Sequence, residues 1–296
     1  MQPTGPERNR APFAVALVIL AIVLLAGGAS ARAAWEQIAR VLSLDGKPEP
    51  ASANVLSAHH LEALDSMAPQ AQAEFLLERA VNHYEGATGQ IERRLPVWRG
   101  RIEPGERFES LFRMAINSDD LRVRAAAVEI DILARKLEKN TETVDRLEPV
   151  ARTGEQGPRA NALWDLGLIG GRGVEQARIA SILLASARDE NVNVRYWAVE
   201  GLAYLASDDV IDPLLDIFHD DRSPMIRERA ACSLAQSGML NREQRMRAVP
   251  RLVDFAGDGA LDDQTRSWVF QALRDITGEN RPHDAAAWRT WYGSLR

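Results

Sequence analysis

Cysteine is almost missing from this chain, because Cys232 is the one cysteine among 296 residues. A lone cysteine excludes an intrachain disulfide framework and a zinc site made of CxxC pairs. Cys232 lies within an apolar pattern that recurs along the chain, so we expect a small buried residue rather than a reactive thiol. Aromatic residues are also scarce at 6%, but seven of them are tryptophans, which suit large anchors between stacked helices.

An excess of basic charge is absent as well. The chain carries a formal charge of −6 at pH 7. Residues 1–33 contain Arg8, Arg10 and Arg32 against Glu7, so the remaining residues carry −8. Affinity for nucleic acid depends on neutralising phosphates with lysine and arginine, and this balance therefore argues against a nucleic-acid partner.

The signatures of common enzyme classes are missing too. No HExxH, GxSxG, P-loop or GxGxxG motif stands out, and the glycine-rich segment 167–173 follows a predicted helix and is interpreted as a loop. The adjacent His59 and His60 would point to different faces of a helix, so they could not together bind one metal ion. We therefore expect no catalytic residue, no metal and no cofactor.

The N-terminus holds a long uncharged apolar run, residues 11–28, which follows Arg8 and Arg10. We interpret it as a hydrophobic helix that targets the chain to a membrane. It is either a signal peptide cleaved after Ala31 or Ala33, or an anchor retained over residues 11–31, close to the ~20 residues that span a bilayer. The arginines keep the N-terminus cytoplasmic, so we expect the rest of the chain to be exported, either periplasmic or anchored in the inner membrane.

Composition divides the chain into five parts. Residues 1–33 form the signal peptide or transmembrane anchor, and residues 34–55 form a linker rich in proline and other helix breakers. Residues 56–106 are interpreted as a helical N-terminal subdomain that caps an array of repeats. About five repeats fill residues 107–276, and residues 277–296 are expected to form a C-terminal capping helix.

The repeats share a two-helix pattern whose second helix is the more regular. An apolar residue and an arginine open that helix, a small residue follows three places after the arginine, and a leucine follows seven places after it. The arginines are Arg124, Arg159, Arg195, Arg227 and Arg266, and the positions three places later hold Ala127, Ala162, Ala198, Ala230 and Val269. The positions seven places later hold Asp131, Leu166, Leu202, Leu234 and Leu273. A small residue lets two helices approach closely, and a leucine fills the gap between layers.

A further helix is expected ahead of each of these arginine-opened helices. The expected ranges are Phe108–Asn117, Val144–Arg152, Val174–Ala187, Val210–His219 and Arg242–Phe255. Pro149, Pro213 and Pro250 lie at matching places in three of them, which predicts a recurrent bend. Paired acids in the turns, such as Asp119-Asp120 and Asp262-Asp263, are interpreted as helix caps, because no loop offers oxygen ligands at the alternate positions that calcium needs.

The recurrent arginines admit two interpretations. Each guanidinium could reach an acid in a neighbouring turn and hold adjacent layers in register, which the acidic turns in this sequence favour. Alternatively, the five arginines could form a stripe that binds an acidic partner.

This combination of arginine, small residue and leucine resembles HEAT repeats, in particular the short HEAT-like type first noted in phycobilin lyases. The resemblance covers about residues 108–276 and implies an all-α fold, an alpha-alpha superhelix or solenoid. Tetratricopeptide-like units are the rival for part of the chain. Deoxyhypusine hydroxylase, a HEAT-like enzyme, holds two irons through repeated His-Glu motifs, and this chain has none.

The end of the chain looks like the terminal segment of many bacterial HEAT-repeat proteins. Gly278 is expected to stop the last repeat helix. Beyond it, Trp288, Trp291 and Tyr292 would lay an aromatic face over the exposed final layer. An aromatic sugar-binding platform is the alternative interpretation.

We therefore expect a non-enzymatic scaffold of the cell envelope that binds another protein. The arginine-opened helices would line its concave side, where the candidate contacts are Tyr196, Trp197, Arg229 and Trp268. Trp164 is expected to lie in the core between layers. The first alternative is a lyase-type enzyme or ligand-binding protein that uses the concave groove. The second is a structural subunit of an envelope complex.

Overall fold

The computed structural model describes residues 54–295, and this part of the chain is all-helical. It contains fourteen α-helices, α3 to α16, and one short 3-10 helix, and its extended residues form only an isolated bridge between Val55 and Glu85. The all-α prediction is confirmed for these residues. The hydrophobic helix expected within residues 1–33 lies outside the described part. Within residues 54–295, no helix is both long enough and apolar enough to cross a membrane.

The helices follow one another in pairs along the chain. After α3 (Ala58–Ser66), the pairs are α4 (Pro69–Val81) with α5 (Ala87–Trp98), α6 (Glu106–Ile116) with α7 (Leu121–Ala134), α8 (Thr141–Thr153) with α9 (Gln156–Gly170), α10 (Gln176–Ser186) with α11 (Val192–Tyr204), α12 (Ile211–Asp220) with α13 (Pro224–Ala235), and α14 (Arg242–Ala256) with α15 (Asp263–Thr277). The 3-10 helix η1 (Asp208–Val210) leads into α12, and α16 (Ala285–Gly293) ends the series.

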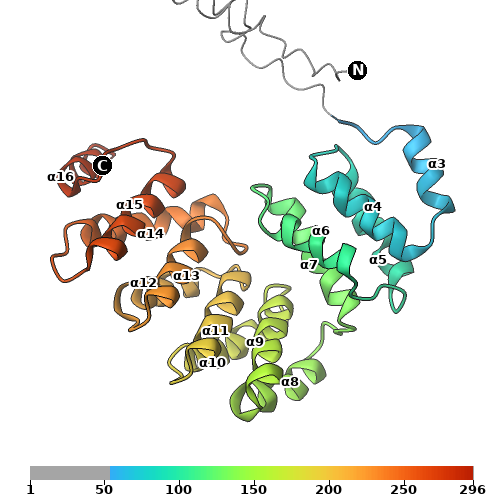
Figure 1. Ribbon diagram of the computed structural model, residues 1–296, viewed down its shortest axis with the longest axis horizontal. Helices are drawn as coiled ribbons and strands as arrows, with labels where there is room; N and C mark the ends of the chain where they lie inside the picture. The colour runs from blue at the N-terminus through green and yellow to red at the C-terminus, as the bar shows by residue number, and fades with distance from the viewer. Residues whose placement is uncertain (1–53, 296) are drawn as a thin grey trace, which may run out of the picture. The chain divides into compact units, whose positions relative to one another are not determined.

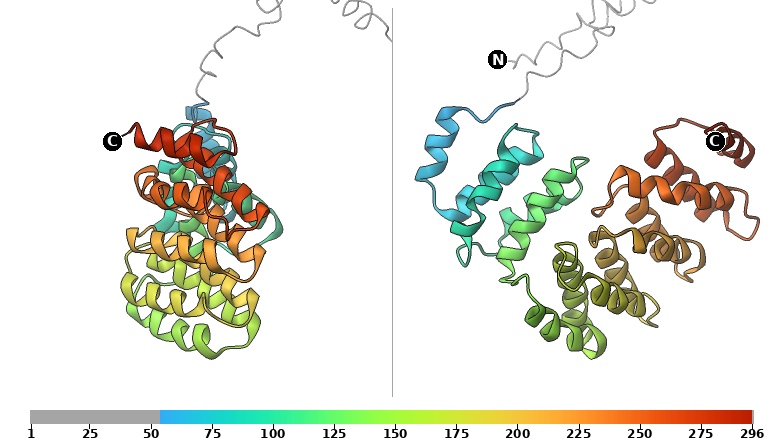
Figure 2. Two further views of the ribbon diagram at one scale, coloured as in Figure 1. Left: turned by 90° about the vertical axis from the view of Figure 1, so that its left-hand side faces the viewer. Right: turned by 180° about the vertical axis from the view of Figure 1, so that it is seen from behind.

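The helices of residues 55–295 form two rows, one of the first helices of the pairs and one of the second helices. The second helices of successive pairs pack on one another, α9 on α11, α11 on α13 and α13 on α15. The first helices form the other row, where α12 packs on α14. Within this unit the pairs follow an arc in chain order (Figures 1 and 2). Each pair thus buries its apolar face against its neighbours, as a repeat that has no core of its own must do.

The pair α4–α5 stacks like the repeats that follow it. Helix α4 packs on α6 and α5 packs on α7, so first helix meets first helix and second meets second. The sequence pattern of residues 56–106 predicts only a helical cap, because the arginine signature is not repeated there. The structure adds that this segment is itself a layer of the stack.

Polar side chains begin several of these helices. Asp120, Asn140, Asn191, Asn241 and Asp262 each accept a backbone N–H of the helix that follows, which confirms the capping role expected of Asp120 and Asp262.

Two helix-breaking residue types lie mostly where the sequence predicts them. Gly278, at φ 76°, ends α15 in the left-handed conformation that glycine adopts without strain. Pro149 and Pro250 lie inside α8 and α14 as expected, but Pro213 is the third residue of α12. The bend predicted at Pro213 is therefore replaced by a helix start, where the missing N–H of proline has no helical partner to lose.

The repeat positions fill the core between the layers. All five small residues and the four leucines of the pattern are buried, and the end of the stack is covered by Trp288 and Trp291 of α16, which packs on α14. Helices α9 and α11 approach each other closely at Gly167, which lies inside α9 and not in the loop expected for residues 167–173. A Cβ added to Gly167 would lie 2.5 Å from the Cα of Gly201, so these two backbones touch only because neither residue has a side chain.

Candidate functional site

Three of the four predicted contact residues line one cavity. Tyr196 and Trp197 of α11 and Arg229 of α13 border a space of about 630 Å³ whose other walls come from α6, α7 and α9. The cavity lies where α7 meets α9, and these two helices share a smaller contact than the second helices of the later pairs do. The looser contact leaves room for a cavity between the layers.

Trp164 of α9 is the centre of the aromatic wall of this cavity. Its ring meets Phe112, Trp197 and Tyr204 edge to face, with ring centroids 6.5, 6.0 and 4.8 Å apart. Trp164 and Tyr204 are buried, whereas Trp197 and its edge-to-face neighbour Tyr196 are partly exposed. The core position expected for Trp164 is confirmed, and the same ring also borders the cavity.

A buried carboxylate, Asp131 of α7, lies beside this wall. It occupies the position that holds a leucine in the four later repeats, yet it is only 3% exposed and lines the cavity. Its Oδ2 accepts from Arg135 Nε at 2.8 Å and from Trp164 Nε1 at 3.3 Å. Burial raises the pKa of Asp131 despite these partners, because the charged form loses its hydration.

A second acid shares the same arginine. Asp165 Oδ1 lies 3.4 Å from Arg135 Nη1, so one guanidinium serves both Asp131 and Asp165. Burial raises the pKa of Asp165 to about 6, and the charge of Asp131 adds to this shift. The charge of Arg146 also acts on Asp165, whereas Asp131 has Arg135 as its one basic partner among the described residues.

The opposite wall carries a paired glutamate and arginine. Glu200 of α11 is buried, and its Oε1 lies 3.2 Å from Nη1 of Arg229. Arg229 also donates to the Ser237 hydroxyl, whereas its buried Nε has no partner in the described part of the chain. Burial and the charge of Glu200 raise the pKa of Tyr204, so this phenol stays protonated.

Trp268 and Cys232 lie outside this cavity. Trp268 of α15 borders a smaller space of about 220 Å³ together with Cys232. The structure therefore does not bring Trp268 together with the other three predicted contacts. Cys232 is partly buried, and burial raises the pKa of its thiol, which lowers the fraction of reactive thiolate.

The repeat arginines form a chain of contacts along one edge of the stack. Arg159 Nη2 donates to Asp189 at 2.7 Å, Arg195 donates to both carboxylate oxygens of Asp221 at 2.8 and 3.1 Å, and Arg227 Nη2 donates to Asp262 at 2.8 Å. In each case the acid belongs to the turn of the next pair. The backbone oxygens of Asp189 and Asp221 also accept from Arg195 and Arg227, so each of these turns is held by two arginines.

The first and last arginines of the series differ from the middle three. Arg266, in the last repeat, donates to the Leu261 carbonyl and lies 3.6 Å from Asp263 of its own helix. Arg124 binds no carboxylate among residues 54–295. It donates instead to the carbonyls of Ser118 and, 114 residues away in sequence, of Gly238 at 2.8 Å. The ladder expected for five arginines thus spans the three middle ones.

The chemistry of the cavity is that of recognition by rings and fixed charges. Partly exposed aromatic rings offer apolar area, Asp131 and Glu200 offer hydrogen-bond acceptors, and Arg229 offers donors. No cluster of three or more potential metal ligands occurs among residues 54–295. The sequence analysis did not identify Asp131 as a site residue, although Asp131 occupies the position at which the four later repeats have leucine.

Comparisons with known proteins bear on the repeats alone. Residues 179–274 match the family model for HEAT repeats. A crystal structure of an engineered protein is 14% identical, over 70% of this chain and 96% of that one, and its TM-score of 0.33 is too low to support an argument. Among curated proteins, none matches this sequence. The family match and the stacked helical pairs together support a HEAT-repeat protein.

Proposed function

We propose that the protein is a non-enzymatic scaffold that binds a segment of another protein in the cavity between α7 and α11. HEAT repeats present extended concave surfaces that commonly mediate binding between proteins. The observation that carries the proposal is the gathering of Tyr196, Trp197 and Arg229 around one cavity. Tryptophan, tyrosine and arginine are the residue types that dominate binding energy at protein interfaces.

The charges support a polar anchor within an apolar contact. Asp131 lines the cavity and shares its one basic partner, Arg135, with Asp165, so a basic side chain of the partner would supply Asp131 with a second positive charge. A cation in this place would also meet the faces of nearby rings, which attract positive charge. The partner segment is therefore expected to carry a lysine or arginine next to apolar side chains.

The test compares the substitution of a tryptophan in this cavity with the substitution of a tryptophan outside it. A photo-reactive amino acid at position 197 captures the partner, and the affinity of the purified partner is then measured for two variants. Trp197→Ala is expected to weaken binding about thirty-fold, the effect of removing an interface hot spot worth about 2 kcal/mol. Trp268→Ala is the matched control, because Trp268 is also partly exposed but lies outside the cavity. Equal effects of the two substitutions would rule out binding at this cavity.

The proposed location is the cell envelope, where the exported scaffold acts alone or as a subunit of an envelope complex. Support comes from the sequence alone, through the apolar run of residues 11–28 behind Arg8 and Arg10. The intact mass of the exported protein distinguishes a cleaved signal peptide from a retained anchor. Loss of residues 1–31 or 1–33 indicates a signal peptide, and an uncleaved chain indicates an anchor over residues 11–31. A chain that stays in the cytoplasm would refute the location.

Binding of a small ligand is the second candidate function. The volume of about 630 Å³ lies within the range of small-molecule sites, and Asp131, which lines the cavity and whose pKa is raised by burial, is the kind of perturbed group found at such sites. Native mass spectrometry of the purified chain tests it. A bound organic molecule that is lost in Trp197→Ala favours this candidate over the protein scaffold.

A further inference from the structure

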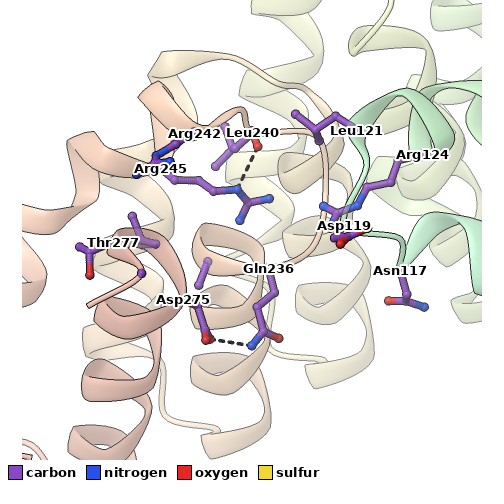
Figure 3. Close-up of a pocket in the computed structure, with 13 residues that line it drawn as sticks. Asn117, Asp119, Leu121, Arg124, Gln236, Leu240, Arg242, Arg245, Asp275 and Thr277 are labelled. Atoms are coloured by element: carbon purple, nitrogen blue, oxygen red, sulfur yellow. Dashed lines mark hydrogen bonds between the residues drawn. The ribbon is translucent and has the colours of Figure 1, made fainter. Parts of the chain in front are cut away.

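A second cavity of about 630 Å³ is bordered by Arg124, whose guanidinium donates to the Gly238 carbonyl. Residues of α7 and of the α6–α7 turn form one wall, and residues of α13, α14 and α15 form the others. Figure 3 shows Arg242 and Arg245 on one side of this space and Arg124 with Asp119 on the other. The first and the last two of the five predicted repeats thus meet at one site.

Two of these arginines are buried without a carboxylate partner. Arg124 is 6% exposed and Arg245 is 9% exposed, and neither forms an ion pair with any residue from 54 to 295. Arg245 donates to the carbonyls of Leu234, Ser237 and Leu240 at 2.8 to 2.9 Å, which fixes the turn after α13. Burial, together with the neighbouring charge of Arg124, lowers the pKa of Arg245 to about 10.

Hydrogen-bond donors remain free in this cavity. Nη2 of Arg124 has no partner in the described part of the chain, and neither does any side-chain nitrogen of the exposed Arg242. Neither acid of the lining forms an ion pair with these arginines. Asp275 accepts from the amides of Gln236 and Gln271, and the exposed Asp119 attracts Arg124 electrostatically but accepts no hydrogen bond from it.

Buried positive charge with free donors calls for an anion. An isolated buried charge is costly, and a guanidinium binds carboxylate and phosphate oxygens through its fork of N–H groups. The volume of about 630 Å³ lies within the range of small-molecule sites. We propose that this cavity binds an oxyanion, the phosphate or carboxylate group of a small molecule, between Arg124 and Arg242.

Equilibrium binding of inorganic phosphate and of succinate to the purified full-length chain tests this proposal. Ionic strength is held constant with chloride, because salt screens non-specific attraction. Saturable binding at one site per chain is expected for at least one anion, and the tighter one distinguishes phosphate from carboxylate recognition. Arg242→Gln is expected to weaken it about ten-fold, as the loss of a charge-assisted hydrogen bond does. The side chain of Arg242 is exposed and forms no hydrogen bond or ion pair within residues 54–295, so we expect this variant to fold.

Arg188→Gln is the matched control. Arg188 is likewise exposed without a side-chain partner in the described residues, but it borders a different cavity between α10 and α12. Its substitution changes the net charge equally and should alter anion binding by less than about two-fold. Three results would overturn the proposal: no saturable binding of either anion, equal weakening in the two variants, or tighter binding of a diamine such as putrescine.

Discussion

Neutralising Asp221 should cost far more stability than neutralising Asp262, although both acids receive an arginine of the same ladder. The side chains of Arg195 and Asp221 are only 5% and 8% exposed, whereas Asp262 is 54% exposed beside Arg227. The Asp→Asn substitution keeps the shape and one oxygen acceptor at each place. The backbone contacts of Ser223 with Asp221 and of Thr265 with Asp262 can therefore be retained.

The magnitude follows from what each substitution leaves behind. Asp221→Asn leaves the guanidinium of Arg195 buried without a carboxylate, so that only neutral oxygens, such as the carbonyls of Asp189 and Glu190, face its charge, and breaking a buried pair in this way costs about 3–5 kcal/mol. We expect about 3 kcal/mol, because those carbonyls remain. For Asp262→Asn we expect a much smaller loss, since water solvates an exposed pair.

Urea unfolding followed by both far-UV circular dichroism and tryptophan fluorescence measures the two free energies of unfolding. Two probes are needed because stacked repeats can unfold in parts, and coincident transitions license a single free energy. If the two substitutions destabilise the protein equally, the buried ladder does not hold the layers in register. The same conclusion follows if Asp221→Asn changes nothing.

Two further predictions concern the α9–α11 contact and the buried acids. Gly167→Ala should lower the free energy of unfolding by about 1–3 kcal/mol, because its Cβ would overlap Gly201. Gly89→Ala, with open space around it in α5, should raise the free energy of unfolding by about 0.5–1 kcal/mol. If urea unfolding shows that both substitutions change this free energy in the same direction, the α9–α11 packing described above is contradicted. Because the pKa of Asp165 is raised from 3.8 to about 6 in the folded state, its contribution to stability is full below pH 4 and is lost as the pH rises through 6. Asp165→Asn should therefore gain stability relative to the unsubstituted protein between pH 4 and pH 7, by at most about 3 kcal/mol, and a pH-independent difference would refute the burial argument.

The repeat architecture could be predicted from the sequence because its signals are local and recur. The arginine, the small residue and the leucine return at spacings of 32 to 39 residues, and a solenoid repeats the same contacts at each step. Helix ends were predictable for the same reason, since Asp120, Asp262 and Gly278 act on backbone groups only a few residues away.

The site could be predicted only in part, because it depends on contacts between distant repeats. Tyr196, Trp197 and Arg229 are recognisable as interface types on the neighbouring helices α11 and α13, but the sequence does not show that α6, α7 and α9 close a cavity beside them or that Trp268 borders another. The contact of Arg124 with the Gly238 carbonyl spans 114 residues and follows no periodic rule. The bend at Pro213 was predicted wrongly, because the residues around the three prolines match although Pro213 lies in the first turn of α12 and Pro149 and Pro250 lie in the interior of α8 and α14.

The most direct test of the proposed function is the affinity of the purified partner for Asp131→Leu. Leucine is the residue that the later repeats hold at this position, and it removes a buried carboxylate whose desolvation is unfavourable. Arg135 would still have Asp165 as its partner, whereas Trp164 Nε1 would lose its acceptor, so the gain from removing the buried charge is offset and the free energy of unfolding should change by less than about 2 kcal/mol. If Asp131 serves recognition, binding should weaken at least about ten-fold while urea unfolding shows an intact fold. Unchanged affinity in a stably folded variant would contradict the proposal that this cavity is where the partner binds.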